Sequence, residues 1–187
     1  GSLLVEVGQC GCQIGSKLHA DLLQYKESSY LRRLKSDTLH TIMIDTEPKI
    51  LKPIQENRKD FSFLDPANIK FFQYGRGNNW SYGYLDSRKV KSTPEEQANT
   101  SSLASRTFSQ GKPASFTEKY YQENSQILEF ALDAIRKEIE RTDCFLGVNL
   151  ICSLGGGTGS GLGTRLCEEI KDNMRIRILA QYCLSIK

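Results

Sequence analysis

The sequence predicts an α/β fold, a Rossmann-like parallel sheet with helices on both of its faces. The first observation behind this prediction is that a strand, a Gly-rich turn and a helix follow one another twice, at residues 3–22 and 145–170. The second is that residues 145–154 are apolar almost throughout, which is typical of a parallel strand covered on both faces. Strands that alternate with helices in this way favour a mostly parallel sheet.

The first strand–helix unit lies at the start of the chain. Residues 3–7 are a short apolar run that ends at the turn 8–11, and a helix is expected from Cys12 onward. Apolar residues recur at helical spacing after this turn, and they predict the face of the helix that is buried in the core. These residues are Ile14, Leu18 and Leu22.

The later elements follow the same pattern. Residues 39–45 predict a strand that ends in the acidic turn 45–48, and residues 124–142 predict the clearest helix of the chain. After the apolar run described above, the Gly-rich segment 155–163 leads into another helix, and residues 177–186 predict a last strand. The buried face of the helix after the glycines is expected to consist of Leu162, Leu166 and Ile170.

Residues 85–121 do not fit a compact domain. They are rich in Lys, Glu, Gln, Ser and Thr and have few apolar anchors, and a loop of this length is uncommon inside a domain. We therefore expect one domain over residues 1–187 that carries a flexible polar insertion at 85–121.

The composition excludes several classes of protein. The 187 residues are 39% hydrophobic and 25% charged, as in an ordinary globular domain. A net charge of +3 without a basic stripe argues against a nucleic-acid partner, and no stretch approaches the roughly 18 apolar residues of a membrane span. The N-terminus lacks the pattern of a secretory signal, so the six cysteines, which form no CxxC motif, are expected to be reduced thiols.

The glycines after the long apolar run predict a phosphate-binding loop. Six of the 15 glycines lie within residues 155–163, together with the hydroxyl donors Thr158 and Ser160. Glycine leaves main-chain N–H groups unshielded, and the following helix adds the partial positive charge of its N-terminus. A flexible linker is the alternative, but a linker is not normally framed by a buried strand and an amphipathic helix.

Two common nucleotide motifs are absent. The pattern GxxxxGK[ST] does not occur, since the pair Gly111-Lys112 is followed by Pro113. The dinucleotide pattern GxGxxG fails in the segment 155–163 and also at the turn 8–11. An oxidoreductase with a nicotinamide cofactor, which would need that second pattern, is therefore disfavoured.

Polar side chains at the ends of the first strands could serve the Mg²⁺ that accompanies a nucleoside triphosphate. Gln9 follows the first strand, and Asp45 and Glu47 follow the next, and such ends open onto one crevice in a doubly wound sheet. An ordinary helix N-cap before Pro48 explains the two acidic residues equally well. The amides of the turn 77–80 could donate to phosphate oxygens, although a plain turn is the commoner reason for Gly and Asn.

Taken together, these motifs resemble the tubulin family. Gly155-Gly156-Gly157-Thr158-Gly159-Ser160-Gly161 is identical to the signature of that family, and residues 8–15 resemble its first nucleotide loop. The strings at 45–48 and 77–80 occur in the family's order, and the resemblance spans nearly the whole chain apart from the insertion.

Among tubulins the chain most resembles the delta class. This resemblance lies in the strings at 47–49, 77–84 and 135–140, and zeta- or epsilon-tubulin is the alternative. It implies an incomplete N-terminal GTP-binding domain of the tubulin/FtsZ type. It also implies a cytoplasmic and cytoskeletal location linked to microtubules, the centriole or basal body and the cilium, with other tubulins or centriolar proteins as partners.

The resemblance also implies a set of site residues for GTP and Mg²⁺. Gln9 and Cys10 would meet the phosphates, and Glu47 would serve Mg²⁺ directly or through water. Asn78 and Ser153 would bond to phosphate or ribose oxygens. The phosphate tail would lie in the cradle of Gly156, Gly157, Thr158 and Gly159.

The chain also departs from the family pattern. Cys12 stands where the family usually has Asn. The chain is also well under half the length of a full tubulin, and it lacks the segments that bind the guanine base in the family. In the family an acidic loop of the neighbouring subunit completes hydrolysis, so this chain alone is not expected to turn over GTP at a useful rate. A truncated product without nucleotide function is the remaining alternative.

Overall fold

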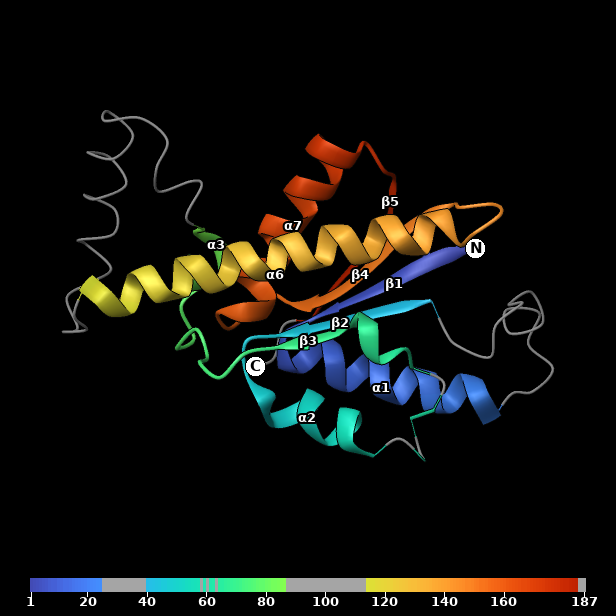
Figure 1. Cartoon of the computed structure of the whole chain (residues 1–187), viewed down its shortest axis with the longest axis horizontal. Coiled ribbons are helices and arrows are strands. Elements are labelled where there is room, and N and C mark those ends of the chain that lie inside the picture. The colour runs from blue at the N-terminus through green and yellow to red at the C-terminus, as the bar shows by residue number, and fades with distance from the viewer. Residues whose placement is uncertain (25–39, 58, 60, 63, 87–113, 185–187) are drawn as a thin grey trace.

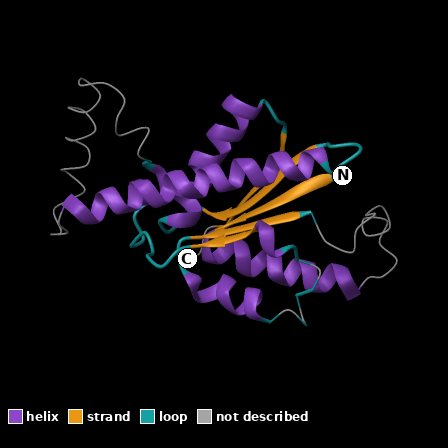
Figure 2. Ribbon diagram, in the orientation of Figure 1, coloured by secondary structure: helices purple, strands orange, loops and turns teal. Residues whose placement is uncertain are grey.

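The computed structural model describes residues 1–24, 40–57, 59, 61–62, 64–86 and 114–184. The described strands form one five-stranded parallel sheet in the order β3-β2-β1-β4-β5, with helices on both faces (Figures 1 and 2). The predicted fold class is therefore confirmed. The strands are β1 (Ser2–Val7), β2 (Thr41–Asp45), β3 (Ile69–Phe71), β4 (Gly147–Ser153) and β5 (Ile178–Leu184).

The helices divide between the two faces of the sheet. In Figure 1, α1 and α2 lie on one face, and α6 and α7 lie on the other. Short π-helical turns, Thr158–Leu162 and Ile170–Met174, flank α7, and a 3-10 turn, Pro66–Asn68, precedes β3. The helices are α1 (Gly8–Gln24), α2 (Pro48–Glu56), α3 (Trp80–Tyr84), α6 (Ala114–Glu140) and α7 (Gly163–Glu169).

The larger part of the core lies between the sheet and the helices α6 and α7. Alternate residues of β1 and β2 point into it, because successive side chains of a strand face opposite sides. The stripe predicted after the glycines is confirmed, since Leu162, Leu166 and Ile170 are completely buried in this core. α6 contributes Ile127, Leu128, Ala131, Ala134 and Ile135.

The opposite face of the sheet is covered by α1 and α2, but not in the way the sequence predicts. Ile14 and Leu18 are 37% and 38% exposed, so the predicted buried face of α1 is wrong. The side chain of Leu22, the third residue of that predicted face, lies outside the described residues. α1 instead buries Gly11, Cys12, Gly15 and His19.

The small residues of α1 are needed because the helix lies very close to the sheet. A Cβ atom on Gly11 would overlap the carbonyl of Ile151 in β4, and one on Gly15 would overlap the carboxyl group of Glu6 in β1. A row of long apolar side chains on this face of α1 would keep the helix too far from the sheet for these contacts. The prediction that this segment is helical is therefore confirmed, whereas the predicted buried face of the helix is wrong.

A buried polar group replaces the apolar contact that those side chains would have made. Glu6 is completely buried in the middle of the sheet, and its Oε1 lies 2.6 Å from His19 Nε2 and accepts from Thr41 Oγ1 at 3.1 Å. Burial raises the pKa of Glu6, and the contact with His19 opposes that rise. The contact joins α1 to the first two strands.

The structure also corrects several predicted boundaries. α1 begins at Gly8, so the predicted turn 8–11 is the first turn of the helix. α6 begins at Ala114, and residues 114–121 are therefore helical, whereas the sequence assigns them to the flexible insertion. Residues 87–113 of that insertion lie outside the described residues. The strand β3 and the helix α3 were not predicted.

We predict that the two helix stripes differ sharply in their contribution to stability. Leu166→Ala should lower the free energy of unfolding by about 2–5 kcal/mol, because it leaves a cavity in the core. Leu18→Ala should cost less than about 1 kcal/mol, because the side chain is already partly in water. Urea unfolding of the 187-residue chain measures both values, and equal losses would contradict the assignment of the buried face.

Candidate functional site

The carboxyl ends of β1, β2 and β4 open onto one pocket of about 570 Å³. This is the edge at which α/β sheets bind ligands, because the loops that leave neighbouring parallel strands meet there. Main-chain segments from four loops or helix starts form its walls. The lining residues are Gln9, Cys10, Gln13, Asp45, Glu47, Arg76, Gly77, Asn78, Ser153, Gly155, Gly156, Gly157, Thr158 and Gly159.

All nine residues that the resemblance implies for GTP and Mg²⁺ line this pocket. They come from three separate parts of the chain, at the start of α1, between β2 and α3, and around the Gly-rich loop. Their roles toward a ligand stay predictions. These residues are Gln9, Cys10, Glu47, Asn78, Ser153, Gly156, Gly157, Thr158 and Gly159.

The Gly-rich loop presents main chain to the pocket. Gly156 has φ +90°, a conformation that favours glycine, and a Cβ atom there would have only Asn78 Oδ1 nearby, at 3.7 Å. A Cβ atom on the neighbouring Gly155 would meet nothing within 4 Å. The loop is therefore open on the pocket side at these two residues.

The start of α1 packs against the same loop without intervening side chains. Gly8 has φ +77°, and a Cβ atom on it would lie 2.8 Å from the main-chain nitrogen of Gly159. A side chain at Gly8 is thus excluded by both conformation and space. This contact brings the N-terminus of the 17-residue helix α1 to the pocket, where its partial positive charge favours an anion.

The hydroxyl groups in and beside the Gly-rich loop make hydrogen bonds with different parts of the chain. Thr158 Oγ1 lies 2.5 Å from Thr46 Oγ1, which ties the loop to the residue after β2. Ser153 Oγ donates to the carbonyl of Gly155 at 2.7 Å, within the loop. Ser160 is buried and donates to the carbonyl of Gly156, so its predicted role as a donor in the pocket is wrong.

Two carboxylates lie on the side of the pocket that β2 forms. Asp45 is 2% exposed, and its Oδ1 accepts from the main-chain nitrogens of Thr46 at 2.7 Å and Glu47 at 3.4 Å. Its Oδ2 is buried, with no hydrogen-bond partner among the described residues. Burial raises the pKa of Asp45 from 3.8 to about 6.

Glu47 is the exposed member of the pair. It is the N-cap residue of α2, but its side chain makes no capping hydrogen bond, and the carboxyl group lies against Gly75 instead. The N-cap alternative is therefore wrong for both carboxylates, because the nitrogens that Asp45 meets belong to Thr46 and Glu47, which precede α2. Two carboxylates suit Mg²⁺, which usually takes one or two from the protein and the rest of its oxygens from phosphates and water. No cluster of three or more metal-ligand side chains occurs among the described residues.

The turn after β3 forms the remaining wall. Gly77 and Asn78 both have left-handed conformations, with φ 57° and 55°, and the nitrogen of Asn79 donates to the carbonyl of Arg76 at 3.0 Å. Asn78 lies on the pocket. Asn79 does not, because its side chain caps α3 by accepting from Ser81 N at 3.0 Å.

The sequence analysis missed Arg76 and Gln13 as lining residues. Gln13 lies one turn after Gln9 on the same helix, so the helical period could have found it. Arg76 is a single charged residue between two glycines, and no pattern in the sequence shows that its side chain is buried.

Two cysteines near the start of α1 have different surroundings. Cys10 lines the pocket and is half-buried, and burial raises the pKa of its thiol. Cys12, which departs from the family pattern, is completely buried in the core beneath α1 and α2 and lies outside the pocket. The replacement of the family's usual Asn by Cys12 therefore affects the packing of the core and not the lining of the pocket. The five cysteines whose side chains the structure describes carry free thiols.

In the part of the chain that the structure describes, no helix has the length and apolar character to cross a membrane.

Comparison with known proteins adds independent findings. The sequence matches the family model described as Tubulin/FtsZ family, GTPase domain, over residues 2–93 and 85–185. It is 28% identical to a tubulin beta-1 chain of Chondrus crispus over 199 aligned residues, which cover 95% of this chain and 36% of the relative. A nucleomorph tubulin beta chain of Guillardia theta is 27% identical, and a tubulin beta-3 chain of Echinococcus multilocularis is 28% identical, with the same coverage. The chain thus spans about a third of the length of these relatives.

We predict that Asp45 makes stability fall with rising pH. Since its pKa is raised in the folded protein, the folded state holds the proton more tightly than the unfolded chain does. The contribution of Asp45 to the free energy of unfolding should therefore be largest near pH 4 and should fall by about 2–3 kcal/mol by pH 7. Asp45→Asn should remove most of this loss in urea unfolding without nucleotide or Mg²⁺. Asp133→Asn, on the exposed surface of α6, should keep the wild-type dependence.

Proposed function

Because the chain belongs to the Tubulin/FtsZ family, whose matching model is its GTPase domain, we propose that it binds GTP together with Mg²⁺ in the pocket at the carboxyl edge of the sheet. The observation that supports this most directly is the pocket itself. It joins the open Gly-rich loop, the N-terminus of α1 and two carboxylates, which are the groups that a magnesium–triphosphate complex needs.

The phosphate tail lies, in this proposal, along the Gly-rich loop. Gly156, Gly157, Thr158 and Gly159 supply main-chain donors, and Gln9 and Cys10 add the first turn of α1. Asn78 and Ser153 close the pocket from the two neighbouring loops and bond to phosphate or ribose oxygens. A series of main-chain N–H groups at a helix N-terminus is well suited to several anionic oxygens at once.

Glu47 holds the metal in this proposal, directly or through water. A Mg²⁺ ion held there would offset the negative charge of the phosphates. The buried Oδ2 of Asp45, which has no partner among the described residues, is a second oxygen on the same side of the pocket. A cation there favours the charged form of Asp45 and so opposes the effect of burial on its pKa.

Hydrolysis depends on a neighbouring subunit in this proposal. The described pocket offers groups that bind phosphate and metal, and the two described carboxylates are better placed as metal ligands than as a base for water. A partner's acidic loop completes the reaction in an assembled protein, so nucleotide binding and turnover are separable. This agrees with a GTP-dependent assembly protein of the microtubule cytoskeleton whose partners are other tubulins.

The finer class is delta-tubulin, with zeta or epsilon as the alternative. The strings at 47–49, 77–84 and 135–140 support it, and they lie at the start of α2, in the turn before α3 with α3 itself, and at the end of α6. A delta-type tubulin is cytoplasmic and acts at the centriole or basal body and at the cilium, with centriolar proteins among its partners.

We predict that GTP with Mg²⁺ stabilises the full-length gene product against heat. At a ligand concentration about 100-fold above Kd, the gain in free energy of unfolding is about 2.7 kcal/mol. Gly155→Val should abolish the gain, because it adds a side chain to a residue that lines the pocket, at a position where a Cβ atom meets no protein atom within 4 Å. Gly157 is unsuitable for this test, since a Cβ atom there would collide with Arg76.

The control for this experiment is Leu154→Ala. Leu154 is 63% exposed, adjacent to Gly155 in sequence and absent from the pocket lining, so the stabilisation by GTP should persist. EDTA should reduce the stabilisation of the wild-type protein. A wild-type protein that GTP does not stabilise, or an equal effect of GTP on Gly155→Val, would overturn the proposed binding mode.

We predict for the finer class that the fluorescently tagged full-length gene product concentrates at centrioles or basal bodies in ciliated cells. Light microscopy with a centriole marker measures this directly. Uniform incorporation along cytoplasmic microtubules would instead indicate a conventional subunit and would exclude the delta class.

A further inference from the structure

A buried side chain outside the pocket connects one of its walls, the turn after β3, to the helix α3. Asn124 lies on α6, is completely buried, and uses both ends of its amide group. Its Oδ1 accepts from Arg76 Nε at 3.0 Å and from Arg76 Nη2 at 2.8 Å. Its Nδ2 donates to the carbonyls of Tyr82 and Leu85, both at 2.7 Å, and lies 3.2 Å from that of Gly83.

The first of these contacts fixes the turn after β3. The side chain of Arg76 is fully buried and also donates through Nη1 to the carbonyl of Tyr74 at 2.5 Å and to Glu123 Oε2 at 3.1 Å. Burial lowers the pKa of this guanidinium group, and Glu123 opposes that effect. The turn that carries Asn78 into the pocket is thereby attached to α6.

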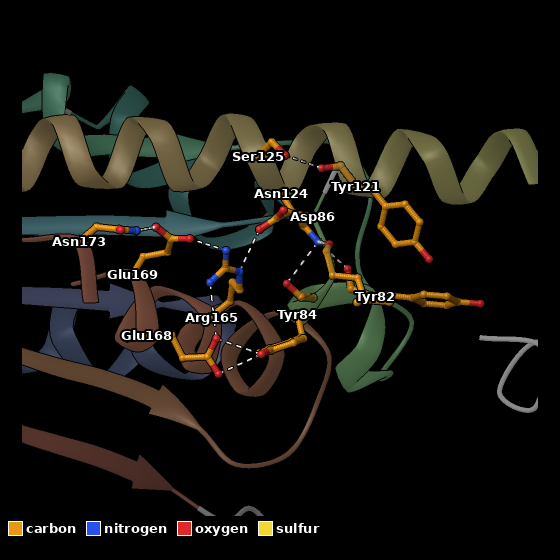
Figure 3. A network of polar contacts seen from close by, with 12 residues as sticks. Tyr82, Tyr84, Asp86, Tyr121, Asn124, Ser125, Arg165, Glu168, Glu169 and Asn173 are labelled. Atoms are coloured by element: carbon orange, nitrogen blue, oxygen red, sulfur yellow. Dashed lines mark hydrogen bonds and ion pairs between the residues drawn. The ribbon is translucent and has the colours of Figure 1, made fainter. Parts of the chain in front are cut away.

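The second contact fixes α3. This helix has only five residues, and Nδ2 of Asn124 satisfies carbonyls at its C-terminal end. A second set of contacts holds the same end from α7, where Tyr84 Oη donates to Glu168 at 2.9 Å and Arg165 Nε donates to Asp86 at 2.9 Å (Figure 3).

Both fixed segments touch the Gly-rich loop main chain against main chain. A Cβ atom on Gly157 would overlap Arg76, and one on Gly83 would overlap the carbonyl of Gly157. A Cβ atom on Gly161 would overlap the carbonyl of Trp80. Because these contacts are made by main-chain atoms and the Cβ atom of Arg76, with no longer side chain between the segments, we expect a shift of residues 76–85 to shift the loop as well.

We propose that Asn124 is the positioning residue of the pocket: it holds the turn 76–79 and the helix α3 in the one arrangement that leaves the Gly-rich loop open toward a phosphate tail. It touches no ligand and acts through the segments that it holds. The identity of the ligand rests on the proposed function, whereas the positioning of the loop does not.

The variant Asn124→Asp separates the two contacts. A carboxylate has the same shape and still accepts from Arg76, but it has no donor and places an oxygen against the carbonyls of Tyr82 and Leu85. Hydrogen–deuterium exchange of the full-length gene product, without nucleotide, should become at least about tenfold faster in peptides covering 80–85 and 157–162. Exchange at 76–79 should change less.

Asn68→Asp is the matched control. Asn68 is also a buried amide that contacts α6, since its Nδ2 donates to Glu138 Oε1 at 2.9 Å, but it lies just before β3, at the opposite edge of the sheet. This variant should lose stability without faster exchange at 157–162. Equal protection of 157–162 in Asn124→Asp and wild type, or equal acceleration in both variants, would overturn the proposal.

The affinity for GTP with Mg²⁺ provides the second readout. Asn124→Asp should weaken binding by about 10- to 100-fold and shift the ³¹P signals of the bound triphosphate, whereas Asn68→Asp should leave both unchanged. Wild-type affinity in Asn124→Asp would contradict the proposal. If the wild-type protein itself binds no GTP, the proposed function fails, and the exchange data alone decide the role of Asn124.

A third variant covers the case in which Asn124→Asp does not fold. Arg76→Lys keeps the charge beside Glu123 but loses the two-fold donation to Asn124. It should release the turn 76–79 and the adjoining Gly157, with faster exchange there, while α3 keeps its contact with Nδ2. Unchanged exchange at both 76–79 and 157–162 would overturn the proposal.

Discussion

The close approach of main chain to main chain around the Gly-rich loop is the constraint on which the rest of this structure depends. The loop lies between the start of α1 on one side and residues 76–84 on the other, and glycine stands at each contact because a Cβ atom would overlap a neighbour. The contact at Gly8 sets where the N-terminus of α1 points. The contacts at Gly83 and Gly157 set how the loop faces the pocket.

This constraint explains why polar contacts are so numerous behind the pocket. Main-chain packing through glycine is close but has little hydrophobic area, so the segments need other attachments. Asn124 of α6 provides them through its contacts with Arg76 and α3, and Arg165 and Glu168 of α7 provide them through Asp86 and Tyr84 (Figure 3). Buried polar groups of this kind are costly when unpaired, and they therefore specify one arrangement when all of their partners are present.

The same requirement for close approach governs α1 on the other face of the sheet. Gly11 and Gly15 bring the helix against β4 and β1, and the buried pair of Glu6 and His19 replaces the contact that long apolar side chains would make. Ile14 and Leu18 are left toward the outside as a result. The position of Gln9 and Cys10 at the pocket follows from the depth of this helix.

The sequence by itself determined the fold class, the place of the Gly-rich loop and most of the residues around the pocket. Strand and helix periods, and glycines after a buried strand, depend on local chemistry that is readable along the chain. Only the tertiary structure decided which face of α1 is buried, how far α6 extends toward the insertion, and that Asn124 and Arg76 lie behind the loop. These depend on which surfaces meet: Asn124 is 48 residues from Arg76 in the chain, and no local pattern records that contact.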